Sequence, residues 1–240
     1  MRFWDEVANL PGLSPVIDYA RQETPWARYI TRLHLLVLQR RVALEPTQRY
    51  LDYGCGVGRI TDWLAPRVTE VTGVDASDAM LQVARRRNRH PNVAFRRVVD
   101  PADLAVDGLD GITAVWVLQH ILDDAEFDAV LDFMARAVKP GGSVYCIDRL
   151  CRDAVDPGES DYLRLRRRGD YEAAFRVRGF VTVVAHPVSV DEQVLGRPNL
   201  TRRIKNGSLC PGLWARLDLA WARRQADPFI ADMFWRFQRT

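Results

Sequence analysis

Residues 51–60, LDYGCGVGRI, place Gly54, Gly56 and Gly58 at alternate positions directly after a strand-like run. Glycine adopts positive φ angles without strain, so such a turn lets the backbone approach a ligand closely. A helix that begins just after the turn directs its free N–H groups at whatever the turn holds. Taken alone, this glycine spacing fits an ordinary tight strand-to-helix turn equally well. The acidic residues around it decide between a binding turn and a plain one.

Three aspartates, Asp52, Asp75 and Asp100, lie at or near the ends of three successive strand-like runs. A carboxylate two residues before the glycine turn suits an ammonium group and not a diphosphate. An acid that ends the second strand of such a fold accepts hydrogen bonds from both hydroxyls of a ribose. An acceptor at the end of the third strand suits the exocyclic amine of an adenine. Ammonium, ribose and adenine without a phosphate together describe S-adenosylmethionine.

The sequence that must position these residues alternates between strand-like and helix-like runs from residue 48 onward. Strand-like runs are predicted at 49–54, 68–75, 93–99, 112–118, 143–148, 180–188 and 229–237. Helix-like runs are predicted at 58–65, 77–88, 124–138 and 170–178. This alternation predicts an α/β fold with a doubly wound, Rossmann-like sheet of about seven strands, mostly parallel with an antiparallel last strand. The ligand crevice is then expected at the carboxyl ends of the strands.

Four regions are predicted along the chain. Residues 1–47 form an N-terminal helical cap, with helices that begin at Ser14-Pro15 and Thr24-Pro25, because serine or threonine before proline is typical of a helix start. Residues 48–188 form the S-adenosylmethionine-binding core. Residues 189–228 form an inserted helical or lid segment, and residues 229–240 return as the final strand of the core.

Five segments follow the order of motifs known from one enzyme family. LDYGCGVGRIT is similar to the family's first motif, VTGVDASDAML to its second, and DPADL to the D-x-x-D-L segment beside the adenine. LDGITAVWVLQHILD is similar to the segment through the fourth strand, and VKPGGSVYCID to the L-K-P-G-G turn into the fifth. From residue 48 to about residue 188 the chain therefore resembles the class I S-adenosylmethionine-dependent methyltransferases, of the small-molecule or glycan methyltransferase type. The resemblance implies methyl transfer with S-adenosylmethionine as cofactor and does not name the acceptor.

The resemblance also implies a role for each matching position. The implied cofactor contacts are Asp52, Tyr53, Gly54, Cys55, Gly56 and Gly58 at the methionine end, Asp75, Ala76 and Met80 at the adenosine, Asp100 and Pro101 at the adenine, and Val115 and Trp116 beside the methionine. Two positions depart from the family pattern. Pro101 lacks the backbone N–H that the family often offers to the adenine ring, and Tyr53 stands where a small residue is common.

His120 is the predicted catalytic residue. It follows the fourth strand at the edge where the methyl group should lie, and imidazole titrates near neutral pH. A hydroxyl acceptor would need such a base, whereas an amine mainly needs its lone pair free. Two other interpretations stay open: the ring packs at a helix start or binds backbone, or it is a structural feature shared across the family.

The acceptor is expected to lie among segments outside the core strands. The candidate substrate-binding residues are Tyr19, Trp26, Tyr29, Arg149 and Tyr162. For Arg149 and its neighbour Asp148, a cap or an internal ion pair is the alternative. The segment 210–225 has three interpretations: an apolar stripe packed on the core, a lid over the acceptor, or a weak contact with a membrane surface.

Composition narrows the choice of partners and compartment. The net charge is +3, and all but two of the basic residues are arginine. The arginine runs lack interleaved aromatic residues, so they are expected to be solvated and no nucleic acid partner is expected. The four cysteines form no C-x-x-C pair, which predicts free thiols and no metal site. With no apolar run of about 18 residues and no apolar signal region, a cytoplasmic location is expected.

The sequence therefore predicts a cytoplasmic S-adenosylmethionine-dependent methyltransferase acting on an oxygen, and less readily a nitrogen, of a small molecule or sugar. Natural-product or polysaccharide biosynthesis is the expected setting. Two alternatives remain: the same fold binding the cofactor for non-methylating chemistry such as a cyclisation, or a regulatory module without turnover. A nicotinamide dehydrogenase is disfavoured, since Arg59 occupies the position of the third glycine of G-x-G-x-x-G.

Overall fold

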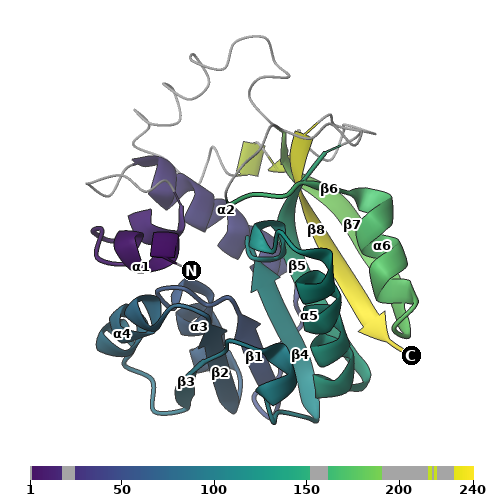
Figure 1. Cartoon of the computed structure of the whole chain (residues 1–240), viewed down its shortest axis with the longest axis horizontal. Coiled ribbons are helices and arrows are strands. Elements are labelled where there is room, and N and C mark those ends of the chain that lie inside the picture. Colours follow the sequence, from purple (N-terminus) through teal and green to yellow (C-terminus); the bar gives the residue numbers. More distant parts are fainter. Residues whose placement is uncertain (1, 18–24, 152–161, 191–215, 218, 221–229) are drawn as a thin grey trace.

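The computed structural model of the chain describes residues 2–17, 25–151, 162–190, 216–217, 219–220 and 230–240. Within these residues, one mixed sheet carries helices on both faces (Figure 1). Tyr19 and most of the predicted insert 189–228, including most of 210–225, lie outside the described residues. The division of the chain into four regions therefore stays a prediction.

In the described part of the chain the sheet has eight strands. Their bounds are β1 (Arg49–Tyr53), β2 (Glu70–Asp75), β3 (Val93–Arg97), β4 (Leu109–Val115), β5 (Val138–Cys151), β6 (Arg166–Arg167), β7 (Phe180–Val190) and β8 (Ile230–Arg239). The order is β3-β2-β1-β4-β5-β8-β7, and the short β6 pairs with β5. The pairs from β3 to β5 are parallel, whereas β8 is antiparallel to both β5 and β7. This confirms the predicted mostly parallel sheet with an antiparallel last strand.

The strand order reverses beside β1. The chain runs from β1 outward to β2 and β3, then returns to place β4 on the other side of β1. In open α/β sheets such a reversal leaves a crevice outside the carboxyl ends of the two strands, and ligands bind there. The residues that follow β1 and β4 are therefore the ones that the fold places at a binding site.

Helices cover both faces of the sheet. The α-helices are α1 (Arg2–Val7), α2 (Pro25–Arg41), α3 (Arg59–Leu64), α4 (Asp78–Arg87), α5 (Asp124–Ala137) and α6 (Arg168–Arg176). Short 3-10 turns are η1 (Ser14–Val16), η2 (Ala65–Arg67), η3 (Pro101–Asp103) and η4 (Leu118–His120). In Figure 1, α5 and α6 lie together over one face of the sheet, and α1 lies beyond the carboxyl ends of the first strands. The α2 helix packs against the opposite face, in a buried cluster with Tyr50, Tyr145 and Ile147.

Alternation along β1 explains the two layers of core. Leu51 and Tyr53 belong to a buried cluster with α5 and α6, whereas Tyr50, one residue away, belongs to a cluster with α2 and α3. Successive strand side chains point to opposite faces, so a strand covered on both sides needs apolar residues at consecutive positions. The run RYLDY meets this need, and Asp52 is the polar exception that the site must explain.

Two expected features at the N-terminus differ from the structure. The helix expected from Ser14-Pro15 is a single 3-10 turn, Ser14–Val16, in the residues described there. A helix that the sequence did not predict, α1, lies at Arg2–Val7. The second expected helix, α2, begins at Pro25 as predicted. An isolated six-residue helix is unstable in water, so α1 depends on tertiary contacts that periodicity does not reveal.

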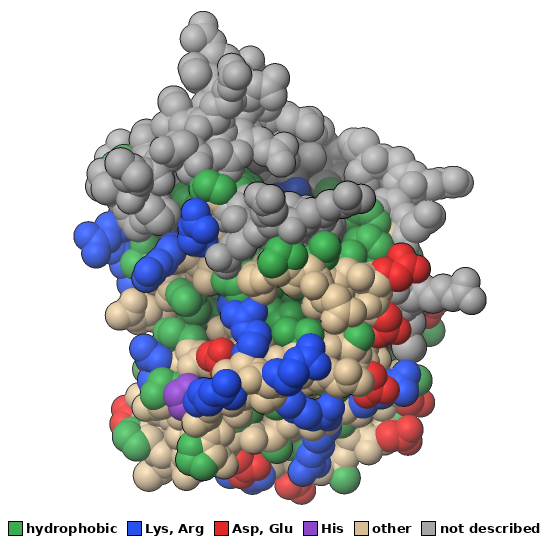
Figure 2. All heavy atoms as spheres, turned by 90° about the vertical axis from the view of Figure 1, so that its left-hand side faces the viewer, with side chains coloured by type: hydrophobic (Ala, Val, Ile, Leu, Met, Phe, Trp, Pro, Cys, Tyr) green, Lys and Arg blue, Asp and Glu red, His purple; other side chains and the backbone are tan. Residues whose placement is uncertain are grey.

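Two arginines of α4 donate hydrogen bonds to backbone carbonyls within the protein. Figure 2 shows basic side chains spread over the face that carries α1 and α4, among acidic and hydrophobic ones. Arg85 donates to the Phe95 carbonyl at 3.1 Å, and Arg87 donates to the Gly12 carbonyl at 2.6 Å. Cations in the last turn also suit the helix macrodipole. The expectation of no nucleic acid partner stays a prediction.

Candidate functional site

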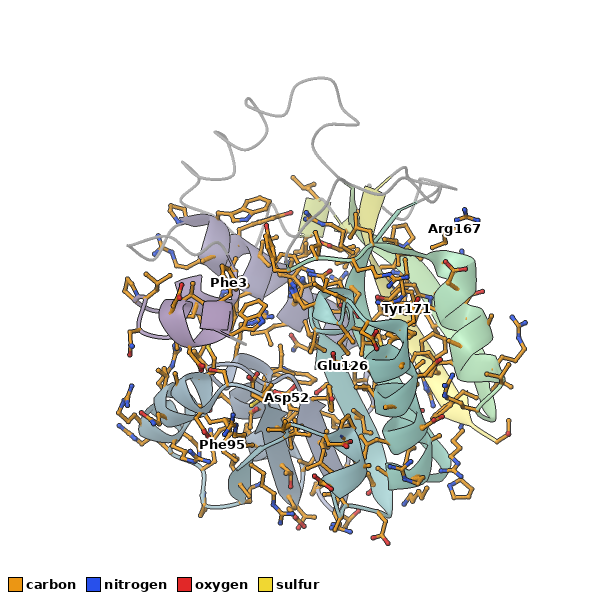
Figure 3. All side chains as sticks on the ribbon, in the orientation of Figure 1. Phe3, Asp52, Phe95, Glu126, Arg167 and Tyr171 are labelled. Atoms are coloured by element: carbon orange, nitrogen blue, oxygen red, sulfur yellow. The ribbon has the colours of Figure 1, made fainter. Side chains whose placement is uncertain are left out.

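A cavity of about 440 Å³ opens at the carboxyl ends of β1, β2 and β4. Its walls come from α1, the turns after β1, β2 and β4, the end of β3, the start of α5 and residue Tyr162. Figure 3 shows three of its lining residues, Phe3 from α1, Asp52 from β1 and Glu126 from α5, on separate elements. Small-molecule sites are commonly clefts of about 300–1,000 Å³ at such a topological reversal.

The glycine turn after β1 forms the floor of this cavity. Gly54 and Gly56 have φ angles of 67° and 52°, in the left-handed region that favours glycine. A Cβ on Gly56 would lie 2.6 Å from Val16 Cγ1, and one on Gly54 would clash with the Val117 side chain. The alternate glycines are therefore needed both for conformation and for space, and they leave bare backbone facing the cavity.

Asp75 ends β2 at the cavity wall and organises the turn. Its Oδ2 accepts a hydrogen bond from the Gly56 N–H at 2.8 Å, and its Oδ1 accepts one from the Ser77 N–H at 2.9 Å. Burial raises the pKa of Asp75, and the backbone N–H donors oppose this increase. Each carboxylate oxygen keeps a lone pair beyond these bonds, so the group can still accept from ligand hydroxyls.

Asp52 is a buried carboxylate that also lines the cavity. Thr61 Oγ1 donates to its Oδ2 at 2.7 Å, and Thr113 Oγ1 donates to its Oδ1 at 2.9 Å. Burial raises its pKa to about 6, although both hydroxyls and the nearby Arg59 act in the opposite direction. An ionised carboxylate so deeply buried favours a cationic partner in the cavity.

The segment after β4 carries a strained residue. Trp116 has a φ of 56°, the one positive value among described residues other than glycine. Its backbone N–H donates to the Ile147 carbonyl at 2.7 Å, and its indole Nε1 donates to Asp232 Oδ1 at 3.3 Å. The Arg149 guanidinium carbon lies 5.9 Å from the Trp116 ring centroid. Such strain is typical of functional segments that their surroundings hold in place.

His120 is held in one tautomer at the cavity wall. Its Nδ1 lies 2.6 Å from the Tyr162 carbonyl, which can only accept, so Nδ1 carries the proton. Its Nε2 then has the lone pair, and the Gln119 side-chain amide nitrogen lies 3.3 Å from it. Gln119 is fixed in turn, because its Oε1 accepts from the Arg149 N–H at 2.7 Å. Burial lowers the pKa of His120, so the neutral ring dominates at neutral pH.

Side chains of Asp148 and Arg166 hold the loop that carries His120 through hydrogen bonds to its backbone. Asp148 Oδ1 accepts from the Val117 N–H at 3.1 Å and from the Gln119 N–H at 3.4 Å. The buried Arg166 guanidinium donates to the carbonyls of Leu118 and Ile121 at 3.3 and 2.9 Å. Asp148 therefore caps the backbone N–H groups of the turn after β4. A capping role was one alternative that the sequence left open for this residue.

The cavity brings together most of the predicted cofactor positions. Its lining includes Asp52, Tyr53, Gly54, Cys55, Gly56, Asp75, Ala76, Met80, Val115 and Trp116. Gly58 is instead the N-cap residue of α3, with a φ of 85°. Asp100 and Pro101 are absent from the lining, and the Asp100 carboxylate accepts from the Ala102 N–H at 2.8 Å. Their contacts with an adenine stay predictions.

The predicted acceptor residues are dispersed. Tyr162 lines the cavity, and Arg149 lies beside it against Trp116. Trp26 and Tyr29 pack with the hydrophobic cluster of α2, and their ring centroids are 5.3 Å apart. Roles for these residues in acceptor binding remain predictions.

The sequence did not predict several residues that line the cavity, chiefly Phe3, Trp4, Val16, Arg59 and Glu126. Trp4 makes an edge contact with the His120 ring at 4.9 Å, and Phe3 stacks on Tyr162 at 5.4 Å. Asp5 Oδ1 accepts from Ser77 Oγ at 2.6 Å, which ties α1 to the start of α4. Only Arg59 carried a sequence signal, because it directly follows the glycine turn.

The sheet order, the glycine turn, the aspartate within β1 and the aspartate that ends β2 agree with the resemblance to class I S-adenosylmethionine-dependent methyltransferases. Residues 51–142 match the sequence family described as "Methyltransferase domain". Over 101 residues the chain is 40% identical to the ubiquinone biosynthesis O-methyltransferase of Alkalilimnicola ehrlichii, a match that covers 40% of each chain. Over 125 residues it is 33% identical to methyltransferase GfsG of Streptomyces halstedii, covering 50% of this chain and 44% of that one. The chain thus spans less than half the length of these two curated relatives.

Solved structures with the same fold are more distant in sequence. The [4+2]-cyclase SpnF superposes with a TM-score of 0.65 at 21% identity, covering 99% of this chain and 91% of that one. The phosphoethanolamine N-methyltransferase 1 of Haemonchus contortus, in complex with phosphoethanolamine and S-adenosylhomocysteine, gives a TM-score of 0.67 at 14% identity, covering 100% and 48%. At such low identity these likenesses establish the fold.

We also searched the described residues for metal sites and for membrane-spanning helices. Within the described ranges, no group of three or more His, Cys, Asp or Glu side chains is placed to hold a metal ion. Among the described helices, none has both the length and the apolar character needed to cross a membrane.

Proposed function

We propose that the chain is an S-adenosylmethionine-dependent methyltransferase whose acceptor is a hydroxyl group of a small molecule or sugar, in the cytoplasm. The observation that carries the oxygen assignment is the His120 ring, whose Nδ1 proton is fixed on the Tyr162 carbonyl while Nε2 keeps its lone pair. An amine acceptor needs no such base. Both curated relatives carry methyltransferase names, and one is named an O-methyltransferase. The buried free thiols Cys55 and Cys146 agree with a reducing compartment.

The residues around the cavity fit the cofactor. The bare backbone of the glycine turn and Asp52 suit the methionine end, with its ammonium group, and Asp75 suits the ribose hydroxyls. Ala76 and Met80 supply apolar walls for the adenosine. When bound there, the cofactor supplies a methyl group already activated on a sulfonium.

The protein's own part in the reaction is to position, desolvate and remove a proton. His120 Nε2 accepts the hydroxyl proton of the acceptor, while the Tyr162 carbonyl stabilises the imidazolium through Nδ1–H. Gln119 faces Nε2 and hydrogen-bonds to it until an acceptor hydroxyl takes its place. Trp4 and Tyr162 cover the ring and limit its access to water.

Transfer of a tritiated methyl group tests the function. Purified protein would be incubated with methyl-labelled S-adenosylmethionine and a panel of phenols, sugars and matched amines. Label in a hydroxyl acceptor, lost in an Asp75→Ala variant that no longer binds cofactor, supports the proposal. Label only in amines would replace the oxygen assignment. Cofactor binding by calorimetry with acceptor consumed but no label transferred would instead support the non-methylating alternative.

A further inference from the structure

Arg59, the first residue of α3, is a buried cation at the cavity wall. The residue is 9% exposed and belongs to the cavity lining. Its one hydrogen bond within the described part of the chain joins NH1 to His34 Nδ1 at 3.2 Å. A guanidinium carries five N–H donors, so most of its hydrogen-bonding capacity is unmet by protein. Groups of this kind are rarely buried without an anionic partner.

His34 does not neutralise Arg59. Because Arg59 can only donate, His34 Nδ1 must accept, and the proton of the neutral ring lies on Nε2. That Nε2 is buried and has no hydrogen-bond partner among the described residues. Burial and the charge of Arg59 both lower the pKa of His34, which keeps the ring neutral. The pair therefore presents a net positive charge at the cavity.

The acid that influences Arg59, Asp52, already accepts hydrogen bonds within the protein. Asp52 influences Arg59 electrostatically, but both of its oxygens accept from the hydroxyls of Thr61 and Thr113. No ion pair joins Arg59 to a carboxylate in the described ranges. At the β1 and β4 end the cavity lining thus has a carboxylate, Asp52, and a guanidinium, Arg59, that form no ion pair with each other. This charge pattern matches the ammonium and carboxylate of an amino acid zwitterion.

Arg59 and His34 lie at one end of the cavity. His34 packs edge-on against Trp116, which follows β4, with ring centroids 4.9 Å apart. On the β2 side of the cavity, Asp75 ends β2, and Ala76 and Met80 follow it. The guanidinium therefore lies at the β1 and β4 end, beside the turn and the carboxylate assigned to the methionine end of the cofactor.

We propose that Arg59, oriented by His34, binds the α-carboxylate at the methionine end of S-adenosylmethionine. This inference rests on the proposed function. A planar guanidinium can donate two parallel hydrogen bonds to a carboxylate, which a lysine ammonium at the same place cannot reproduce. Asp52 would bind the ammonium of the same amino acid group, so the two charges together select the zwitterion.

Two ligands that differ by a single carboxylate test this assignment. Calorimetry would measure the binding of S-adenosylmethionine and of decarboxylated S-adenosylmethionine to wild type, Arg59→Gln and Arg59→Lys. Arg59→Gln should weaken S-adenosylmethionine binding about tenfold or more and change binding of the decarboxylated ligand by less than about twofold. Arg59→Lys should be intermediate for S-adenosylmethionine, because it keeps the charge and loses the paired donors. Arg67→Gln, a change at an exposed arginine that donates to the Trp63 carbonyl, is the matched control and should bind both ligands as wild type does.

The outcomes separate this inference from the proposed function. Equal weakening for both ligands in Arg59→Gln and in the charge-keeping Arg59→Lys would overturn the assignment and make Arg59 a structural residue. Unchanged cofactor affinity with a raised KM for an acidic acceptor would also overturn it and assign the guanidinium to the acceptor. If wild type binds neither ligand, the proposed function itself fails and the inference fails with it.

Discussion

At the scale of single residues, the base role proposed for His120 depends on which of its two ring nitrogens holds the proton. The Tyr162 carbonyl fixes that proton on Nδ1, and burial keeps the ring neutral by lowering its pKa. A base that must be neutral loses activity as it becomes protonated. The acidic limb of kcat is therefore expected below His120's ordinary value of about 6.5, with a plateau at neutral pH.

His120→Gln tests this residue directly. The variant should lower kcat about 10²–10⁴-fold, since the amide cannot accept the proton, and should abolish the acidic limb that belongs to the base. Steady-state kinetics across pH would measure both effects, and calorimetry should show unchanged cofactor binding. A fall in kcat with the pH limb intact would assign the base elsewhere and leave His120 a structural role.

The ionised form of Asp52 suits a cationic ligand but lowers the stability of the folded protein. Burial raises the pKa of Asp52 in the folded protein to about 6, above the ordinary aspartate value of about 3.9, so the folded state holds this proton more tightly than the unfolded chain. Its favourable contribution to stability is complete below the unfolded value and is lost as pH rises through about 6. Above that pH, the ionised buried group costs on the order of 3 kcal/mol.

Asp52→Asn removes that cost. Its free energy of unfolding, relative to wild type, should be higher at about pH 8 than at about pH 4.5, as urea titrations would show. The same change should weaken cofactor binding, because a neutral amide does not attract an ammonium. If the difference between the two proteins did not vary with pH, Asp52 would be ionised in the fold at both values.

At the scale of elements, α1 contributes a wall of the site from a distant part of the sequence. Trp4 contacts His120, and Asp5 accepts a hydrogen bond from Ser77 at the start of α4. Trp4→Ala should raise KM several-fold and move the acidic limb of kcat upward, toward about 6.5, because water then reaches the ring. Glu6→Ala, on the exposed side of the same helix, should leave both unchanged. An unaltered pH profile in Trp4→Ala would show that α1 does not control the environment of the base.

The contrast between α1 and β1 explains what the sequence could predict. β1, the glycine turn and α3 follow from local rules: apolar alternation, glycines where φ is positive, and a helix directly after them. The left-handed Trp116 does not follow, because its strain is held by the Ile147 carbonyl and Asp232, far away in the chain. Motif order selected residues that line one cavity, while the partners of Arg59 and His120 required the tertiary structure.

At the scale of the whole molecule, the last strand joins the site to the stability of the sheet. β8 enters between β5 and β7 and pairs with both. One end of β8 carries Asp232, whose Oδ1 accepts from Trp116 Nε1 and lies 3.4 Å from Arg149 Nε. Nearer the other end, Phe237 is fully buried and stacks on Phe175 of α6, with ring centroids 3.8 Å apart. One strand thus contributes both to the edge of the sheet beside the cavity and to the distant core.

Two variants on β8 should separate these contributions. Phe237→Ala should lower the free energy of unfolding by about 3–5 kcal/mol, because it leaves a cavity in a packed core, while the folded protein keeps its KM values. Asp232→Asn should change stability less and lower kcat or raise the acceptor KM, because Trp116 and Arg149 lose a charged partner. Urea unfolding and steady-state kinetics on both variants give the comparison. Equal kinetic defects in the two would mean that the site responds to general loosening of the sheet and not to the Asp232 contacts.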